Sequence, residues 1–303
     1  MLAIAIGVAA FGGGVWLLVE SVEGLLATVR GWAAAAGLSG VVLAALVLGF
    51  DVESTGAGIA ATLKDLPGTA LGTSIGAGIF LVTVGLGAAA LVAPFRVEVP
   101  AALLLAPALA TALPTALLMD GTLSRVDGAL LVAAYFPLLY AIARSRLAPV
   151  RAEEPREPPS HPLLRVAGGV IGLTLGAELL VLGTERIVDE LAISETVFGL
   201  LVVAAAVSLE ELVLEMLPAY RGYAELAVGN ALGTLVFLLT LSLGVVVLVR
   251  PIEVPDPVRT VHAPALCVSV AVVLALLARG RLGRREGAAL GALYAGYLVL
   301  ALR

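Results

Sequence analysis

The sequence is poor in charge, cysteine and histidine. Only 14% of its 303 residues are charged and 60% are apolar, with a mean hydropathy of +1.08. This composition excludes an ordinary soluble domain and indicates a polytopic membrane protein. The single cysteine, Cys267, excludes an internal disulfide and a thiolate metal cluster. His161 and His262 lack metal-ligand spacing, so we expect no histidine metal site.

Ten apolar segments approach or exceed the roughly 20 residues that cross a hydrocarbon core. A charge or a cluster of Pro and Gly ends each segment, which predicts an all-α polytopic membrane protein with ten transmembrane helices. Because Met1–Ala10 lacks a basic segment, we expect no cleavable signal peptide. The predicted segments are 2–19, 38–63, 69–93, 99–119, 128–144, 164–184, 196–220, 226–249, 260–278 and 286–302.

Lysine and arginine are unevenly distributed over the loops between these segments. Twelve of the 18 basic residues fall on one side, and the richer side is expected to face the cytoplasm. The other side carries Lys64, Arg125, Arg186, Arg250, Arg259 and Arg303. We therefore expect an integral protein of the plasma (inner) membrane with both its N- and C-termini outside.

A polar stretch divides the chain into two similar halves. Arg151–His161 (RAEEPREPPSH) is too charged and too rich in proline to pack, so it indicates a linker. Gly72, Gly76 and Pro94 recur as Gly229, Gly233 and Pro251, an offset of 157 residues. With five segments in each half, an odd number, the second copy must be inverted. We expect a five-helix repeat over 1–144, a cytoplasmic linker over 145–163 and a second five-helix repeat over 164–303.

Carboxylates lie deep within the second and seventh segments. They belong to Gly49–Glu53 (GFDVE) and to Ser208–Glu211 (SLEE). An ionisable group at the bilayer centre costs about 2.5–3.5 kcal/mol, so a chain that keeps several usually employs them on an ion path. On helical spacing, Asp51, Ser54 and Thr55 share one face. Ser208, Glu211 and Glu215 share another.

These two faces offer oxygen ligands of the kind that hard cations prefer. Glu53 and Glu210 are further candidates, and Glu215 is expected to reach a water-filled mouth. A structural role for Asp51 and Glu211, such as capping broken helices, is the alternative. Asp120 and Asp127 flank a short turn, where a turn role is expected.

The third and eighth segments carry glycine at a spacing of four residues. They include Leu71–Phe80 (LGTSIGAGIF) and Val228–Phe237 (VGNALGTLVF). This spacing lets two helices approach closely, and packing is the usual reason for it. The two segments also hold side-chain oxygens that packing does not require, on Thr73, Ser74, Asn230 and Thr234.

Together these motifs resemble the cation/calcium antiporter family, which includes the sodium/calcium and calcium/proton exchangers. That family has two inverted five-span halves, each with a G-T-S-L-P-E motif followed by a G-N-x-x-G-S motif. The second half keeps AVSLEE at Ala206–Glu211 and GNALGT at Gly229–Thr234. Met119–Gly128 (MDGTLSRVDG) is similar to the family's turn between its fourth and fifth spans.

The resemblance implies that Glu211 is the ion-binding glutamate of the second repeat. The first repeat departs from the family, since Ser54 stands in place of the other glutamate and Asp51 in place of a serine. We expect Asp51 and Glu211 to face each other and to share a cation, of unknown identity, or to alternate as proton carriers. The expected ion-binding residues are Asp51, Ser54, Thr73, Ser208, Glu211, Asn230 and Thr234.

The function that this resemblance implies is secondary active cation antiport, with Ca2+ or Na+ exchanged for Na+ or H+ by alternating access. The first and sixth segments would slide as a gating pair past the remaining helices. We expect no enzymatic activity and no cofactor, only the transported cation (Ca2+, Na+ or H+). The expected partners are the lipid bilayer and small inorganic cations, with no nucleic acid, and the oligomeric state stays open.

Two other classes of function remain. The missing oxygens in the first repeat allow a degenerate, non-transporting family member that acts as a sensor or partner subunit. An intramembrane aspartyl hydrolase also needs two acids at depth. The absence of a second Asp within the segments disfavours it.

Overall fold

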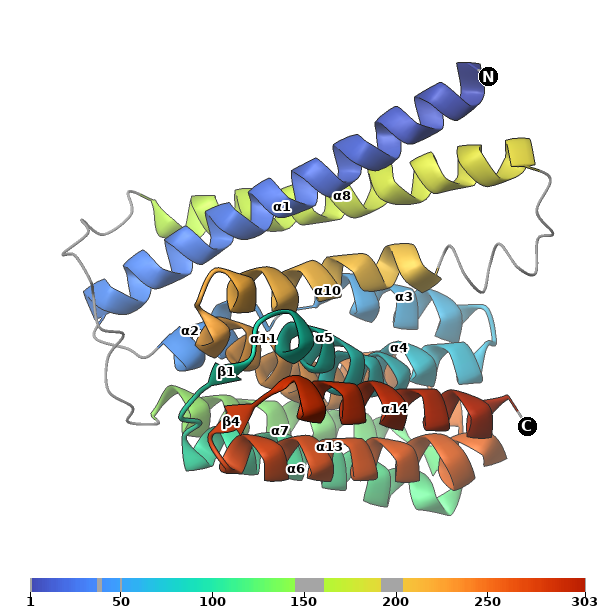
Figure 1. The fold of residues 1–303 in the computed structure, drawn as a ribbon. Coiled ribbons are helices and arrows are strands. Elements are labelled where there is room, and N and C mark those ends of the chain that lie inside the picture. The colour runs from blue at the N-terminus through green and yellow to red at the C-terminus, as the bar shows by residue number, and fades with distance from the viewer. Residues whose placement is uncertain (1, 37–39, 50, 145–160, 192–203, 303) are drawn as a thin grey trace.

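The computed structural model describes residues 2–36, 40–49, 51–144, 161–191 and 204–302. Most of these residues are helical, and helices of both halves of the chain pack side by side (Figure 1). The prediction of an all-helical polytopic protein is confirmed at this level, because seven helices in the described residues are long and apolar enough to cross a membrane.

The first half begins with a long helix and continues through shorter ones. The helical elements in order are α1 (Leu2–Ala36), α2 (Gly40–Val47), α3 (Val52–Leu63), α4 (Pro67–Phe80), η1 (Leu81–Gly85), α5 (Leu86–Val92), α6 (Ala101–Leu117), η2 (Leu118–Asp120) and α7 (Arg125–Ala143). Two short strands, β1 (Phe95–Arg96) and β2 (Thr122–Leu123), lie between them.

The second half has a similar order of elements. Its helical elements are α8 (Pro162–Leu191), α10 (Ala204–Tyr220), α11 (Ala224–Phe237), η4 (Leu238–Ser242), α12 (Leu243–Val249), η5 (Val258–His262), α13 (Ala263–Ala278) and α14 (Arg284–Ala301). Its two strands are β3 (Ile252–Glu253) and β4 (Arg281–Leu282).

Three of the ten predicted segments are not among the seven long apolar helices. The segment 38–63 is divided between α2 and α3, with Leu48–Asp51 between them, and 286–302 corresponds to α14. The segment 196–220 lies only partly in the described chain, where α10 begins at Ala204. The first helix continues to Ala36, well past the predicted end at residue 19. The total of ten spans stays a prediction.

The centre of the molecule is formed by α4 and α11 with the π-helical segments that follow them. Every residue of α11 except Glu225 is buried, and the chief apolar core joins α4, α11 and η4 to α6, α7, α13 and α14. Both π-helical segments, η1 and η4, lie between two α-helical stretches. A π-helical turn is often found at functional sites.

The helices α1 and α8 form a separate layer on this core. They lie side by side along most of their length and cross one face of the remaining helices (Figure 1). Large apolar side chains such as Val8 and Trp16 on α1 and Ile171 on α8 are exposed. In a membrane protein such side chains are suited to lipid contact.

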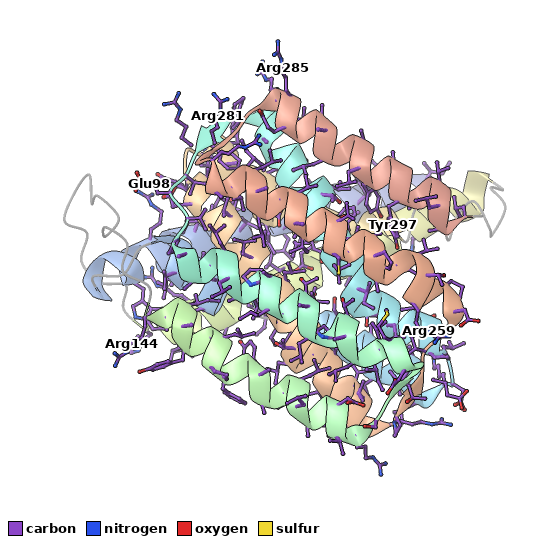
Figure 2. All side chains as sticks on the ribbon, turned by 90° about the horizontal axis from the view of Figure 1, so that it is seen from below. Glu98, Arg144, Arg259, Arg281, Arg285 and Tyr297 are labelled. Atoms are coloured by element: carbon purple, nitrogen blue, oxygen red, sulfur yellow. The ribbon has the colours of Figure 1, made fainter. Side chains whose placement is uncertain are left out.

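Two small antiparallel strand pairs join the halves at their loops. Phe95 of β1 pairs with Leu282 of β4, and Thr122 of β2 pairs with Glu253 of β3. Arg144, Arg281 and Arg285 lie toward one end of the helices and Arg259 toward the other, as the sequence-based division into two sides predicts (Figure 2).

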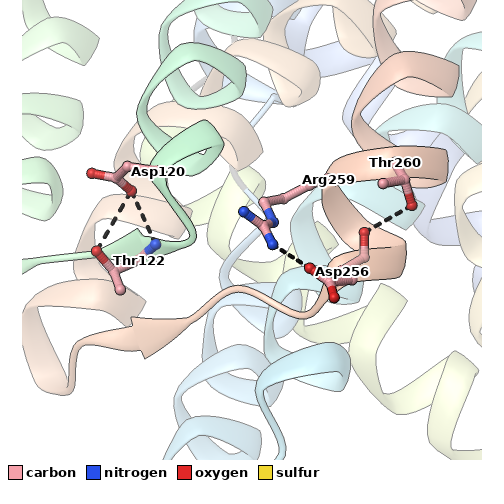
Figure 3. Close-up of polar contacts among 5 residues, drawn as sticks. All are labelled: Asp120, Thr122, Asp256, Arg259 and Thr260. Carbon is pink, nitrogen blue, oxygen red and sulfur yellow. Dashed lines mark hydrogen bonds and ion pairs between the residues drawn. The ribbon is translucent and has the colours of Figure 1, made fainter.

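The turn before α7 has the role that its sequence predicts. Asp120 Oδ1 accepts a hydrogen bond of 3.0 Å from the backbone N–H of Thr122. Asp127 and Ser124 cap α7 reciprocally. Opposite this turn, Arg259 pairs with Asp256 (Figure 3). Asp120 and Asp127 are therefore structural residues.

Candidate functional site

The candidate site begins where the second predicted segment is broken. Gly49 is buried between α2 and α3, and a Cβ atom added there would lie 2.7 Å from the carbonyl carbon of Gly233. It would also lie 2.9 Å from the backbone nitrogen of Thr234. Only glycine allows this approach, so Gly49 places the break in the helix against α11.

Asp51 caps the helix that follows the break. Its Oδ1 accepts a hydrogen bond of 2.8 Å from the backbone N–H of Ser54, at the N-terminus of α3. An N-terminal carboxylate also interacts favourably with the helix dipole. The structural role considered for Asp51 is therefore observed, and its role as an ion ligand stays a prediction.

Thr55 connects this helix to the second half of the chain. Its hydroxyl donates to the backbone oxygen of Asp51 at 3.0 Å and lies 2.9 Å from the hydroxyl of Ser242, the last residue of η4. Ser54 is half-buried. The expected polar face of Asp51, Ser54 and Thr55 thus lies beside a π-helical segment.

The acidic residues of the seventh segment lie on α10. Glu210 and Glu211 are half-buried, and Glu211 acts electrostatically on Glu215 of its own helix and on Tyr294 of α14. The expected sites Ser208 and Glu53 lie on helices, but their side chains fall outside the described part of the structure. That Asp51 and Glu211 face each other also stays a prediction.

The burial of Glu215 differs most from expectation. Its side chain is 0% exposed, whereas the sequence predicted that it reaches a water-filled mouth. Neither carboxyl oxygen has a hydrogen-bond partner among the described residues. A Cβ atom added at Gly85, the last residue of η1, would clash with this carboxyl group, lying 2.7 Å from its Cδ. The carboxyl group therefore occupies the space that a side chain at residue 85 would fill.

The glycine-containing segments place their side-chain oxygens in the core. Asn230 and Thr234 of α11 are 2% and 5% exposed, and Ser74 of α4 is 0% exposed. Neither the Asn230 Oδ1 nor the Ser74 hydroxyl has a hydrogen-bond partner in the described part of the chain. Thr73 is half-buried, and its hydroxyl donates a hydrogen bond of 2.8 Å to the backbone oxygen of Ala70. Unpartnered buried oxygens are costly, and packing alone gives no reason for them.

These oxygens are of the kind that a hard cation prefers. Within the described ranges, no group of three or more His, Cys, Asp and Glu residues could hold a metal ion. A cation here would depend on amide, hydroxyl and backbone oxygens in addition to carboxylate. This agrees with the loss of one glutamate from the first repeat.

Sequence reasoning did not single out two residues of this region. Gly85 and Ser242 end the two π-helical segments and are 157 residues apart, the same offset that relates Gly72 to Gly229. Applying that offset along the whole third segment would have identified the pair. The burial of Glu215 had no such signal, because it depends on which helix covers α10.

His262, for which no metal role was expected, has a side-chain partner. Its Nδ1 lies 2.8 Å from the Tyr297 hydroxyl, and the ring of Tyr297 contacts that of Tyr294. The three side chains His262, Tyr297 and Tyr294 thus form a row from the start of α13 to α14, and Tyr294 is the residue on which Glu211 acts. Tyr297 lies nearer Arg259 than the arginine-rich end (Figure 2).

Comparison with known proteins identifies a family profile that covers almost the whole chain and relatives that cover part of it. The profile described as sodium/calcium exchanger protein matches residues 6–143 and 161–303. The inner membrane protein YrbG of Escherichia coli is 31% identical over 281 residues, 84% of this chain and 84% of YrbG. The sodium/calcium exchanger MaX1 of Methanosarcina acetivorans is 30% identical over 148 residues, 45% of this chain and 42% of MaX1.

The fold also matches that of a solved structure. The sodium-calcium exchanger NCX_Mj, soaked with zero Na+ and Ca2+, superposes with a TM-score of 0.84. The match covers 99% of this chain and 100% of that chain at 24% sequence identity. At this identity the likeness establishes the fold alone.

Proposed function

The chain belongs to the sodium/calcium exchanger family, and from that premise we propose that it is a secondary active cation antiporter. It exchanges Ca2+ or Na+ for Na+ or H+ by alternating access, with the cation as cargo and no cofactor. It is not an enzyme, since no step requires covalent chemistry. Its surroundings are the lipid bilayer.

One observation carries this proposal. Three buried polar groups have no hydrogen-bond partner among the described residues: the Glu215 carboxyl on α10, the Asn230 Oδ1 on α11 and the Ser74 hydroxyl on α4. Each costs free energy in a low-dielectric interior unless a cation, proton or water completes it. A path for cations through these helices would explain why all three polar groups are buried without partners.

The element order supports two inverted repeats of five helices over 1–144 and 164–303. The order α4–η1–α5 recurs as α11–η4–α12, with π-helical segments of five residues at the same offset. Inverted repeats in transporters place the binding site near the bilayer midplane, where the repeats meet. Glu211, Asn230 and Thr234 from one repeat and Asp51, Ser54 and Thr73 from the other would form that site, with Ser208, Glu53 and Glu210 nearby.

The layer of α1 and α8 is suited to be the moving part. Glycines let the two helices approach closely: a Cβ at Gly14 would lie 2.7 Å from the Gly176 oxygen, and one at Gly183 would lie 2.7 Å from the Gly7 oxygen. Bound cation or protons neutralise the carboxylates and let this apolar layer slide across them, whereas charged empty carboxylates resist it.

The distribution of arginine supports an orientation. The end that carries Arg144, Arg281 and Arg285 faces the cytoplasm and the end with Arg259 faces outward, which places both termini outside. The expected location is the plasma (inner) membrane, in keeping with the name of the relative YrbG.

Flux in proteoliposomes tests the proposal. The purified protein is reconstituted with Na+, H+ or Ca2+ gradients imposed one at a time, and uptake of labelled Ca2+ or Na+ is measured against protein-free vesicles. We expect uptake with at least one opposing gradient. Uphill uptake that persists after that gradient is dissipated would contradict antiport.

A non-transporting relative is the second candidate, and the capping role of Asp51 favours it. A carboxylate engaged with the Ser54 N–H is less available to a cation, and the first repeat has lost its glutamate. For a sensor or partner subunit, we expect binding of a cation without flux under any gradient. The same vesicles therefore separate the two functions.

A further inference from the structure

We propose that Glu215 is a proton-binding site and carries the coupling proton of this antiporter. The inference rests on the proposed function and specifies one of its ions. It is carried by the burial of the Glu215 carboxyl group, the lack of a hydrogen bond to it from any described residue and its position against Gly85.

The surroundings of Glu215 accommodate a neutral acid and not an ion. The side chain is 0% exposed, and neither oxygen accepts a hydrogen bond from the described residues. An ionised carboxylate without a partner in such a place costs several kcal/mol, which protonation removes. The conformation described here therefore holds Glu215 as the protonated acid.

Titratable groups on the surrounding elements do not offset a negative charge at Glu215. No such residue occurs on η1 or α5. On the other helices packed against α10, the described titratable side chains are Glu20, Glu23 and Arg30 on α1, Arg165, Glu178 and Arg186 on α8, and Glu225 on α11. Glu23 pairs with Arg221, and Arg30 acts on Glu225. The charge that acts on Glu215 is that of Glu211, of the same sign.

The position of Glu215 links it to the cation site. It lies four residues after Glu211, one helical turn along the same face of α10. Two neighbouring carboxyl groups in low dielectric do not both ionise without a cation, so they favour a single shared negative charge. A cation at Glu211 would stabilise ionised Glu215, and loss of the cation would favour reprotonation.

One proton moves against one cation, which is electroneutral for Na+ and moves one net positive charge for Ca2+. When the site opens, the cation enters beside Glu211, the O–H bond of the Glu215 carboxyl group breaks and its proton passes to water on that side, leaving a carboxylate. This carboxylate adds a second negative charge beside Glu211, in place of the glutamate that Ser54 replaces in the first repeat. On the other side the cation leaves and Glu215 takes a proton from water.

The Glu215→Gln variant tests the inference because glutamine keeps the shape and neutrality of the protonated acid. In vesicles, we expect wild-type cation uptake to be coupled to proton release and to change about tenfold per pH unit where one proton competes. Glu215→Gln should retain exchange of one cation for the same cation but lose proton movement, with a pH response below about twofold. Glu98→Gln, at an exposed position of the loop after β1, is the matched control and should behave as wild type.

A second pair of variants tests the geometry without removing the acid. Gly85→Ala places a methyl group in the space of the Glu215 carboxyl, whereas nothing lies within 4 Å of a Cβ at Gly76. We expect Gly85→Ala to shift the pH response and Gly76→Ala to leave it unchanged. An equal response in both would contradict the assignment.

Infrared difference spectra of the purified protein give a readout that does not require transport. Adding the cation that binds should remove the carbonyl band of a protonated carboxyl group in the wild type, and the band should be absent from Glu215→Gln. If this holds without any flux, the proton site stands and the antiporter function fails. Proton coupling or the band persisting in Glu215→Gln overturns the proton site, as does loss of cation-for-cation exchange in a folded variant.

Discussion

At the scale of single residues, the two candidate acids Asp51 and Glu211 differ in what surrounds them. Asp51 ends a break in a helix and bonds to the Ser54 N–H, whereas Glu211 lies inside α10 and acts on Glu215 and Tyr294. A cap and a charged ligand make different demands on residue 51, so substitutions can separate them.

Replacing Asp51 by Asn keeps a good N-cap and removes the charge. We expect Asp51→Asn to melt within a few degrees of wild type and to lose cation flux. Asp51→Ala removes the cap as well and should cost about 0.5–2 kcal/mol of stability. Thermal unfolding and vesicle flux of the two variants provide the measurement. Full flux in Asp51→Asn would show that Asp51 caps α3 and does not bind the cation.

Glu211 lies inside α10 and not at the N-terminus of a helix, so its substitution tests the ion site more directly. We expect Glu211→Gln to lose cation flux by at least about 100-fold, in keeping with the loss of one charged ligand worth about 3 kcal/mol. The variant should still fold, because glutamine keeps the volume of the side chain. Flux of Glu211→Gln near the wild-type rate would remove it from the site.

The sequence predicted the burial of some candidate site residues and missed that of another. Asn230 and Thr234 are buried on α11 as the glycine spacing favoured, because a helix that approaches its neighbours closely must lie in the core. Glu215 was expected to reach water, because helical spacing shows which residues share a face but does not show which other helix covers that face. The covering residue, Gly85, is 130 positions away in the chain.

At the scale of elements, apolar length predicted helices well and their ends less well. The helices α6, α7 and α13 lie close to 99–119, 128–144 and 260–278. The break at Gly49 was not predicted, because it depends on contact with α11. The extension of α1 to Ala36 was not predicted either, because the helix continues through charged residues.

Contact between α1 and α8 depends on glycine, which gives a prediction for this pair of helices. In Gly14→Leu the added side chain has no room, since its Cβ would lie 2.8 Å from the Leu180 nitrogen. Overpacking of this kind costs about 1–3 kcal/mol. We expect a lower melting temperature and slower flux. Gly12→Leu, where nothing lies within 4 Å, is the control on the same helix.

At the scale of the whole molecule, the two strand pairs mark opposite ends and define an orientation that labelling can test. In a Cys267→Ala background, which removes the only cysteine, single substitutions Glu98→Cys and Asp256→Cys place a thiol at each end. Both positions are exposed.

We expect a membrane-impermeant thiol reagent added to intact cells to label Asp256→Cys and to label Glu98→Cys only after the membrane is opened. Positive residues are retained on the cytoplasmic side during insertion, which is the physical reason for this result. The reverse labelling pattern would invert the proposed topology.

The helical, polytopic class followed from the sequence because charge and apolar length largely determine which segments can enter a membrane, whereas the ten spans and their inverted repeats stay predictions. The family followed from two short motifs in the second half, and the profile match over both halves confirms it. The identity of the cation did not follow, because amide and hydroxyl oxygens accept several hard cations.

The central claim is that buried oxygens around Glu211 hold a cation as cargo. The most direct measurement is the melting temperature of the purified wild type and of Glu211→Gln while Ca2+, Na+ or H+ is titrated separately. A cation that binds the folded state stabilises it by about 2.7 kcal/mol at 100 times its Kd. The account predicts this rise for at least one cation in the wild type and its loss in Glu211→Gln. An unchanged melting temperature with every cation, or the same rise in both proteins, would contradict it.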